Sequence, residues 1–340
     1  MSGGMTESQR FLVATGMRDE GPFIVEWVCW YRMLGFEVLV ATNDCTDHSV
    51  ALLEALQDAG WLTHAPHKPR KDQPPQKSAL RKIITHPLTA QVDWTLICDV
   101  DEFLVLHQHE SIAGLIGPAP HDFMAMVFNW KCFGQGEWDR YQDGIVHRQF
   151  RHCGMGHLPM NRPFKTLLRN PTEWNRLGAH FPHGFRGDWA APASRVVTPS
   201  GTPLPQFNDP EKHPIRFLEK EQIDHETAQM NHYIIRAKES YDHKRDILTA
   251  AGFKVRYTDE FYNRYNRNGM RDVTAARFQG RFAAMHAQAL ALPEILRLHH
   301  ICCAEYVARM ARKRGEDAEA DPRYLHHMKI ANRVAANRNP

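Results

Sequence analysis

The chain has 340 residues, enough for one large domain or two modest ones. Hydrophobic residues make up 43% and charged residues 24%, which is the composition of a globular chain and excludes a disordered one. The formal net charge of +3 gives no electrostatic reason to expect nucleic acid or an anionic membrane as partner, so we expect a small molecule or a saccharide.

The seven cysteines form no CxxC pair and no even framework, so we expect reduced thiols. The opening MSGGMTESQR lacks the layout of a signal peptide, and no apolar run approaches the length that spans a membrane. We therefore expect a cytoplasmic protein without a transmembrane segment. Peripheral contact with the inner face of the membrane is compatible with this sequence.

The first hundred residues alternate short apolar runs with amphipathic segments. The apolar runs predict strands at Phe11–Thr15, Val38–Ala41 and Trp94–Cys98. The amphipathic segments predict helices from Pro22 to Gly35, at Ser49–Ala59 and at Gln76–Ile84, the last preceded by a loop near 65–75. Alternating strands and helices imply right-handed crossovers and a mostly parallel sheet, so the fold class is α/β.

Polar clusters follow three of these strands. They are Thr15–Glu20, Asn43–Asp47 and Asp99–Glu102. Because ligands bind beyond the carboxyl ends of parallel strands, we expect the clusters to converge on one edge of the sheet.

The periodicity changes beyond residue 120. We expect a strand at Phe123–Trp130, a turn at Phe133–Gly136, and loops with short strands from 144 to 215. Helices are expected at Gln222–Arg236, at Ser240–Ala251 and from 272 to 312, before a loosely attached polar tail at Lys313–Pro340.

Asp99 and Asp101 stand at positions i and i+2 beyond a buried strand, where both carboxylates can reach one cation. Mg²⁺ and Mn²⁺ prefer oxygen ligands and share their shell with water and substrate phosphates. An isolated D-x-D is more often a solvated acidic turn. Its position after Trp94–Cys98, beside two other polar clusters, favours a metal and a nucleotide diphosphate instead.

Four ordered blocks resemble family 2-like glycosyltransferases, in the branch whose acidic motif reads D-x-D-E-F. The blocks read MRDEGPFIVEWVCWYRMLGF, TNDCTDHSVALLEAL, PPQKSALRK and DWTLICDVDEFL. The resemblance covers about 1–135 and resumes weakly at Asn231–Tyr233. It implies a GT-A fold and metal-dependent transfer of a sugar from a nucleotide-sugar donor, linked to UDP or GDP, to a saccharide or other hydroxyl acceptor. It also favours inversion at the anomeric carbon and a role in polysaccharide biosynthesis.

The resemblance also divides the chain and assigns roles. It implies a nucleotide-sugar-binding half at 1–135, an acceptor-side region with C-terminal helices at 136–312, and a polar tail at 313–340. The donor would be bordered by Thr15, Arg18, Asp44, Arg81 and Asp99, and the metal would be bound by Asp99, Asp101 and His232. The family often has Asn where this chain has Asp19.

The catalytic base is a separate question, because an inverting transferase needs a carboxylate to deprotonate the acceptor. Glu137 and Asp139, after the Gly134-x-Gly136 turn, are the candidates, although either fits an exposed loop equally well. Glu102 is closer to the acidic pair, but the following Phe103 suggests a structural role.

Basic residues could steady a leaving diphosphate. Lys165 with Arg169 and Lys244 with Arg245 are the candidates, although such residues are more often merely solvated.

Two other functions fit parts of this pattern. One is a non-catalytic saccharide-binding protein on a transferase scaffold, because a fold alone does not fix function. The other is a haloacid dehalogenase-like phosphohydrolase, which also places D-x-D after a strand. The donor nucleotide, the sugar, the acceptor and the oligomeric state are not readable from the sequence.

Overall fold

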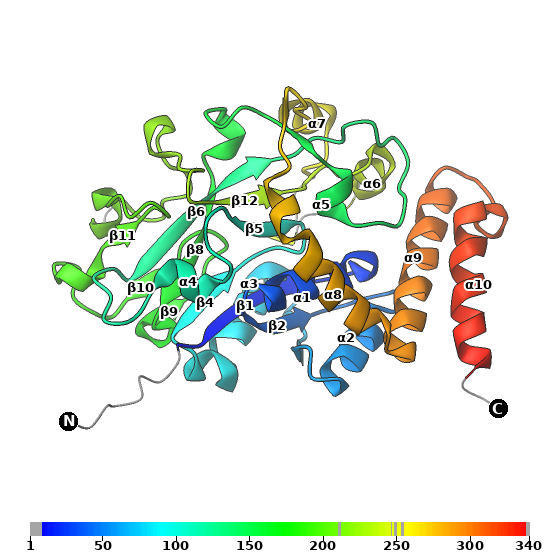
Figure 1. Ribbon diagram of the computed structural model, residues 1–340, viewed down its shortest axis with the longest axis horizontal. Coiled ribbons are helices and arrows are strands. Elements are labelled where there is room, and N and C mark those ends of the chain that lie inside the picture. The colour runs from blue at the N-terminus through cyan, green and yellow to red at the C-terminus, as the bar shows by residue number, and fades with distance from the viewer. Residues whose placement is uncertain (1–8, 210–211, 246, 248–249, 253–254, 338–340) are drawn as a thin grey trace.

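The computed structural model describes residues 9–209, 212–245, 247, 250–252 and 255–337 (Figure 1). A large mixed sheet runs through the middle of the molecule, with helices packed on it and a helical C-terminal region at one end. The α/β class with a mostly parallel sheet and C-terminal helices is therefore confirmed.

Nine strands form the main sheet, in the order β3-β2-β1-β4-β8-β6-β12-β5, with β11 paired to β6. Neighbours from β3 to β4 are parallel, as are β6 with β12 and β6 with β11, whereas β8 and β5 run antiparallel to their neighbours. The strands are β1 (Phe11–Met17), β2 (Glu37–Thr42), β3 (Thr63–Pro66), β4 (Trp94–Ile97), β5 (Glu102–Leu106), β6 (Ala125–Cys132), β7 (His152–Cys153), β8 (Phe164–Arg169), β9 (Trp174–Arg176), β10 (His183–Phe185), β11 (Val196–Val197), β12 (Ala228–His232) and β13 (Met270–Arg271).

The helices are concentrated in the first hundred and the last hundred residues. The α-helices are α1 (Ile24–Met33), α2 (Ser49–Asp58), α3 (Pro75–Ile84), α4 (Ile112–Ile116), α5 (Val146–Gln149), α6 (Lys238–Lys244), α7 (Asp259–Tyr265), α8 (Gln279–Leu290), α9 (Pro293–Lys313) and α10 (Pro322–Ala336). Short 3₁₀ turns are η1 (Gly21–Phe23), η2 (Pro87–Gln91), η3 (Pro159–Asn161), η4 (Pro171–Glu173), η5 (Pro192–Ser194), η6 (Pro205–Asn208), η8 (Lys220–Gln222), η9 (Thr274–Phe278) and η10 (Ala318–Ala320).

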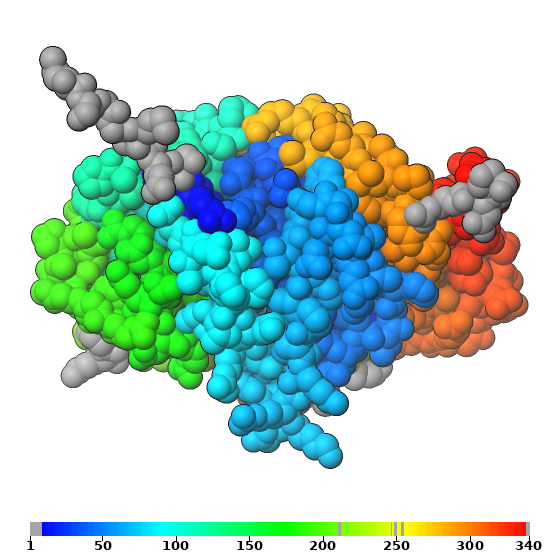
Figure 2. All heavy atoms as spheres, turned by 90° about the horizontal axis from the view of Figure 1, so that it is seen from below, coloured from blue at the N-terminus to red at the C-terminus, as the bar shows by residue number. Residues whose placement is uncertain are grey.

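The sheet separates two hydrophobic cores. Successive side chains of a strand point to opposite faces, so Val13 of β1 joins one core while Leu12 and Ala14 join the other. Helices α1, α2, α8 and α9 contribute to the first core, and α3 contributes to the second. Figure 2 shows the N-terminal half at the centre of one face, flanked by the middle of the chain and by α9 with α10.

Helix α1 fixes the segment after β4. It follows the turn η1, which contains Pro22, and the chain leaves it through Gly35 at φ +94°. Two fully buried indoles of this helix reach the acidic segment: Trp27 Nε1 donates to the Asp99 carbonyl at 3.0 Å and Trp30 Nε1 to that of Leu104 at 2.8 Å. The predicted helix therefore also anchors Asp99, the first residue of D-x-D, and Leu104 in the strand that follows the motif.

The helix predicted at Gln222–Arg236 is wrong. Residues 228–232 form β12, which lies between β6 and β5 and exchanges backbone hydrogen bonds with both. Met230 enters the core, whereas Gln229 and Asn231 lie together on the other face and are joined at 2.6 Å. Pairing on both edges therefore overrides a helical sequence preference.

Other differences concern segments expected to be loops or tail. Strand β3 overlaps the start of the predicted loop near 65–75. By contrast, the loops with short strands predicted from 144 to 215 are confirmed by β7 to β11, of which β8 lies in the middle of the sheet. Residues 322–336 are not loosely attached. They form α10, in which Arg323 donates to the Tyr141 carbonyl and to Glu239, each at 2.7 Å, and Ala331 is buried.

The predicted helical run from 272 to 312 is confirmed by η9, α8 and α9. Helix α6 covers the start of the predicted helix Ser240–Ala251, of which residues 246 and 248–249 lie outside the described residues. Residues 1–8 and 338–340, at the two ends of the chain, also lie outside them. Within the described part of the chain, no helix combines the length and the apolar character that a membrane crossing requires.

Replacing Trp30 by Ala should destabilise the fold by about 3–5 kcal/mol, because the change empties a fully buried site and removes the bond to Leu104. Urea unfolding of the full chain measures the loss. Trp30→Phe should cost less, since it keeps most of the volume, and Trp61→Ala, at a half-buried position, serves as control. Equal losses for Trp30→Ala and Trp61→Ala would contradict the role given to Trp30.

Candidate active site

The polar clusters converge at one edge of the sheet, where β2, β1 and β4 end side by side. The amide of Cys98 donates to the Ala14 carbonyl at 3.1 Å, so the chain leaves β4 beside the end of β1. The first two clusters are in contact, because the Thr46 amide donates to Asp19 Oδ1 at 2.7 Å. Arg309 of α9 joins them, with Nη1 3.2 Å from Asp19 Oδ2.

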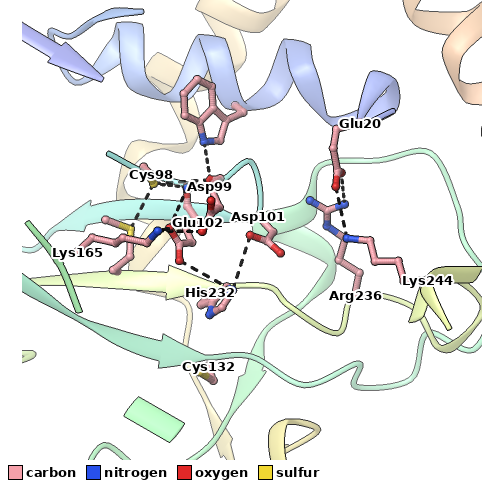
Figure 3. Close-up of polar contacts among 12 residues, drawn as sticks. Glu20, Cys98, Asp99, Asp101, Glu102, Cys132, Lys165, His232, Arg236 and Lys244 are labelled. Carbon is pink, nitrogen blue, oxygen red and sulfur yellow. Dashed lines mark hydrogen bonds and ion pairs between the residues drawn. The ribbon is translucent and has the colours of Figure 1, made fainter. Parts of the chain in front are cut away.

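Lys165 lies beneath the acidic segment (Figure 3). It comes from β8, the antiparallel neighbour of β4, and only 1% of its surface is exposed. Its Nζ is 2.8 Å from Asp99 Oδ2 and 2.9 Å from Glu102 Oε2, and the same Glu102 oxygen accepts from the Asp99 amide at 2.9 Å. Burial would lower the pKa of Lys165, but Asp99 and Glu102 raise it well above its ordinary value. Glu102 is fully buried, and burial raises its pKa to about 8 although Lys165 opposes the change.

Asp101 and His232 face each other across the ends of β5 and β12. His232 Nε2 is 3.7 Å from Asp101 Oδ1 and 3.9 Å from Glu102 Oε1, and the Tyr233 amide donates to the Asp101 carbonyl at 2.8 Å. The Trp130 ring lies against His232, with centroids 4.2 Å apart.

The charge states of this pair follow from its surroundings. Burial would raise the pKa of Asp101, but His232, Lys244 and Arg236 hold it at about 2. Burial lowers the pKa of His232 to about 4, although Asp101 opposes the change. At neutral pH the pair is therefore a carboxylate facing a neutral imidazole.

Two cations lie on the other side of Asp101 and share Glu20 as a counter-ion (Figure 3). Arg236 Nη1 is 3.1 Å from Glu20 Oε2, and Lys244 Nζ is 3.4 Å from Glu20 Oε1. The guanidinium also stacks on Phe23 at 3.5 Å from the ring centroid. Arg236 is 3% exposed and has φ +56°, a backbone conformation that costs a non-glycine residue about 1–3 kcal/mol. Two of its nitrogens, Nε and Nη2, have no hydrogen-bond partner among the described residues, so the group has donors left for an anion.

The donor set suits a hard divalent cation that is completed by a ligand. Neighbouring ligands of an octahedral ion at about 2.1 Å lie about 3 Å apart, close to the 3.7 Å between Asp101 and His232. Asp99, with 44% of its side chain exposed, still has Oδ1 free of Lys165. Among the described residues, the sets of three ligand atoms that lie within 4.8 Å of one another do not include Asp101 or His232. A cation bound by Asp101 and His232 would therefore need further oxygens from water and phosphate.

The residues predicted to border the donor are spread along this edge. Thr15 is buried at the end of β1, whereas Arg18 and Asp44 are exposed just beyond β1 and β2. Asp44 has φ +48°, which places its turn in the left-handed region. Arg81 is exposed on α3, two residues beyond Ala79, and α3 packs closely on the end of β1 at Gly16.

Glu137 and Asp139 lie apart from the acidic pair. Both are exposed in the loop after β6, and Asp139 Oδ1 accepts from Gln135 Nε2 at 2.9 Å. Asp139 lines a cavity of about 380 Å³ with Lys238 and Asp242. Within the described chain, no hydrogen bond or ion pair links either carboxylate to Asp101 or His232.

The basic candidates divide into two groups. Lys165 and Lys244 lie beside the acidic residues, whereas Arg169 donates to the His121 carbonyl and Arg245 binds Asp242 at 2.9 Å. Sequence reasoning missed Glu20 and Arg236, although Glu20 lies in the first family block and Arg236 follows Asn231–Tyr233 closely. The signal for Lys165 is a lysine inside the apolar run Phe164–Leu168.

No protein-family model and no curated protein sequence matches the chain. Among solved structures it is similar to the mannosyltransferase PcManGT from Pyrobaculum calidifontis in complex with GDP-Man and Mn²⁺, at 12% identity and TM-score 0.36 over 97% of this chain and 86% of that one. It is also similar to S. aureus TarS 1-349 in complex with UDP-GlcNAc, at 10% identity and TM-score 0.33 over 97% of this chain and 92% of that one. At such identities, neither structure assigns a role to a residue of this protein.

Lys165→Met should destabilise the chain by about 3–5 kcal/mol, because it leaves Glu102 buried without its counter-ion. Adding Glu102→Gln should recover part of the loss, since the amide needs neither the counter-ion nor the proton that burial imposes on the Glu102 carboxyl. Chemical denaturation of the single and double variants measures both effects. Lys238→Met, at a more exposed pair with Asp242, should cost under about 1 kcal/mol. Independent, additive effects of Lys165→Met and Glu102→Gln would show that the two groups are not coupled.

Proposed function

We propose that this protein is a metal-dependent glycosyltransferase that moves a sugar from a nucleotide-diphosphate sugar to a saccharide or other hydroxyl acceptor, with inversion. The observation that carries the proposal is the pair formed by the Asp101 carboxylate and the neutral His232 imidazole, 3.7 Å apart at the ligand-binding edge of the sheet. The four blocks that resemble family 2-like glycosyltransferases supply the reaction class.

The donor would occupy the edge where β2, β1 and β4 end. In this proposal Thr15, Arg18, Asp44 and Arg81 border the base and ribose, as the resemblance implies. Asp101, His232 and the free oxygen of Asp99 would hold Mn²⁺ or Mg²⁺. When bound, the cation would neutralise charge on the diphosphate. UDP- and GDP-linked sugars both fit this description.

The leaving diphosphate would be steadied by this chain's own cations. Arg236 has two donors without partners among the described residues, and Lys244 lies beside it. Arg236 is buried and Lys244 is partly buried, which strengthens their attraction to a developing negative charge. Glu20 holds them in place through ion pairs at 3.1 and 3.4 Å.

The acceptor would approach from the region that follows β6. We assign 1–135 to the donor and 136–312 to the acceptor side, with His232, Arg236 and Lys244 reaching the donor from the second part. Glu137 or Asp139 is the candidate base that takes the acceptor proton. The cavity of about 380 Å³ beside Asp139, lined by both acidic and basic side chains, is of a size and polarity that suit a saccharide.

Asp101→Asn should lower Mn²⁺-dependent hydrolysis or transfer of a nucleotide sugar by at least about 100-fold, because the amide is a poorer ligand than the carboxylate. A screen of UDP- and GDP-sugars with Mn²⁺, without and with acceptors, provides the measurement. Asp93→Asn is the matched control, since this exposed acid lies at the opposite end of β4.

Two results would contradict the proposal. Activity of Asp101→Asn at the level of the unchanged chain would exclude the role of the acidic motif. Calorimetry that detects no binding of UDP or GDP with Mn²⁺, while a saccharide binds, would indicate the non-catalytic alternative. A covalent phosphoaspartate trapped with a phosphate mimic would indicate the phosphohydrolase.

Replacing the catalytic base should reduce transfer to the acceptor by about 100-fold or more, while the affinity for the donor nucleotide stays unchanged. Asp139→Asn and Glu137→Gln are tested in parallel, with transfer measured by product formation and nucleotide affinity by calorimetry. Because the two residues lie in one exposed loop, each variant serves as the control for the other. Full transfer activity in both variants would place the base elsewhere.

A further inference from the structure

Three segments meet at the C-terminal end of the molecule around a group of metal-binding side chains. Asp143 comes from the loop before α5, His299 and Cys303 from α9, and His327 from α10. Helices α9 and α10 lie side by side there as an antiparallel hairpin (Figure 1). His299 and Cys303 are four residues apart, so they lie on one face of α9.

Three of these side chains already bring ligand atoms together, and His299 lies beside two of them. Ligand atoms of Asp143, Cys303 and His327 all lie within 4.8 Å of one another. His299 Nε2 is 3.5 Å from Asp143 Oδ1 and 3.7 Å from Cys303 Sγ. With Zn–N and Zn–O bonds of about 2.0 Å and Zn–S of about 2.3 Å, tetrahedral geometry places N and O about 3.3 Å apart and N and S about 3.5 Å apart. The group therefore needs only shifts of a few tenths of an ångström along these two edges.

Three of the four side chains are buried, whereas Asp143 is exposed at the surface. Cys303 is fully buried, and His327 and His299 are 3% and 7% exposed. Tyr141 OH donates to Cys303 Sγ at 3.6 Å, which supports a thiolate, and His300 Nδ1 lies 2.9 Å from His327 Nδ1 and can fix its ring. His299 turns Nε2 toward Asp143 and Cys303, while its other ring nitrogen, Nδ1, is buried without a hydrogen-bond partner among the described residues.

We propose that Asp143, His299, Cys303 and His327 bind a zinc ion that fastens α10 and the loop at Asp143 to α9. A thiolate with two imidazoles and one carboxylate favours zinc over the harder Mn²⁺ and Mg²⁺. The site is structural, because four protein ligands leave no position for a substrate. It is independent of the proposed transferase activity and shares no residue with the edge that carries Asp101.

The test uses the full chain, freed of metal with a chelator and then titrated with Co²⁺. One equivalent should give the tetrahedral cobalt spectrum with a thiolate-to-cobalt charge-transfer band, which zinc should then abolish by displacement. This band reports the thiolate, so cobalt bound at Asp101 and His232 cannot produce it. Absence of the band, together with the absence of one equivalent of tightly bound zinc, would overturn the proposal.

Variants identify the ligands. Cys303→Ser should abolish the band, and His327→Asn should weaken Co²⁺ binding by more than the 10- to 100-fold that loss of a second-sphere partner costs. Cys302→Ser is the matched control, because Cys302 is the next residue in sequence but its thiol lies beside Gly21 and not in the proposed zinc site. Zinc should raise the melting temperature of the unchanged chain and of Cys302→Ser but not of Cys303→Ser. A band that survives Cys303→Ser, or disappears equally in Cys302→Ser, would contradict the assignment.

Discussion

The ammonium group of Lys165 lies between the carboxylates of Asp99 and Glu102, within 2.9 Å of each. Two neighbouring carboxylates at the end of a buried strand repel each other and lose hydration, and a cation held between them offsets both costs. Glu102 in turn positions the start of β5, whose partner in the ladder is His232. The separation between Asp101 and His232 therefore depends on the positive charge of Lys165.

That charge comes from a different part of the chain than the acidic motif. The parallel strands β1, β2 and β4 bring the first three polar clusters together within the first hundred residues. Strand β8 then returns antiparallel beside β4 with Lys165, and β12 adds His232 between β5 and β6. Arg236 and Lys244 follow β12 and reach back to Glu20. The candidate site is thus completed by residues that lie more than sixty positions beyond the motif.

This arrangement explains what the sequence could predict. Alternating apolar runs and amphipathic segments bounded by Pro and Gly are local signals, so the elements up to Trp94–Cys98, except β3, and the convergence of their polar ends follow from the sequence. Strand β12 does not follow, because Gln229, Met230 and Asn231 form a strand only when β5 and β6 bind both edges. Lys165 and Arg236 are similar: their roles depend on partners distant in sequence. The buried face of α10 was missed because its buried members, His327 and Ala331, are not large apolar residues and so give no strong hydrophobic pattern.

The two proposed cation sites differ in what the protein itself supplies. At Asp101 and His232 the chain offers few ligands, so the bound ion is selected by the oxygens of the ligand it shares and by the metal available. At Cys303 the chain itself offers a thiol, two imidazoles and the Asp143 carboxylate, so selection rests on the protein ligands. Zinc generally outcompetes Mn²⁺ for nitrogen and oxygen ligands, because it stands higher in the order of affinities. At the donor site the protein supplies only part of the metal ligands, so binding requires the substrate phosphates and zinc has less advantage over Mn²⁺ there. At the structural site the protein supplies all of the ligands, which favours zinc.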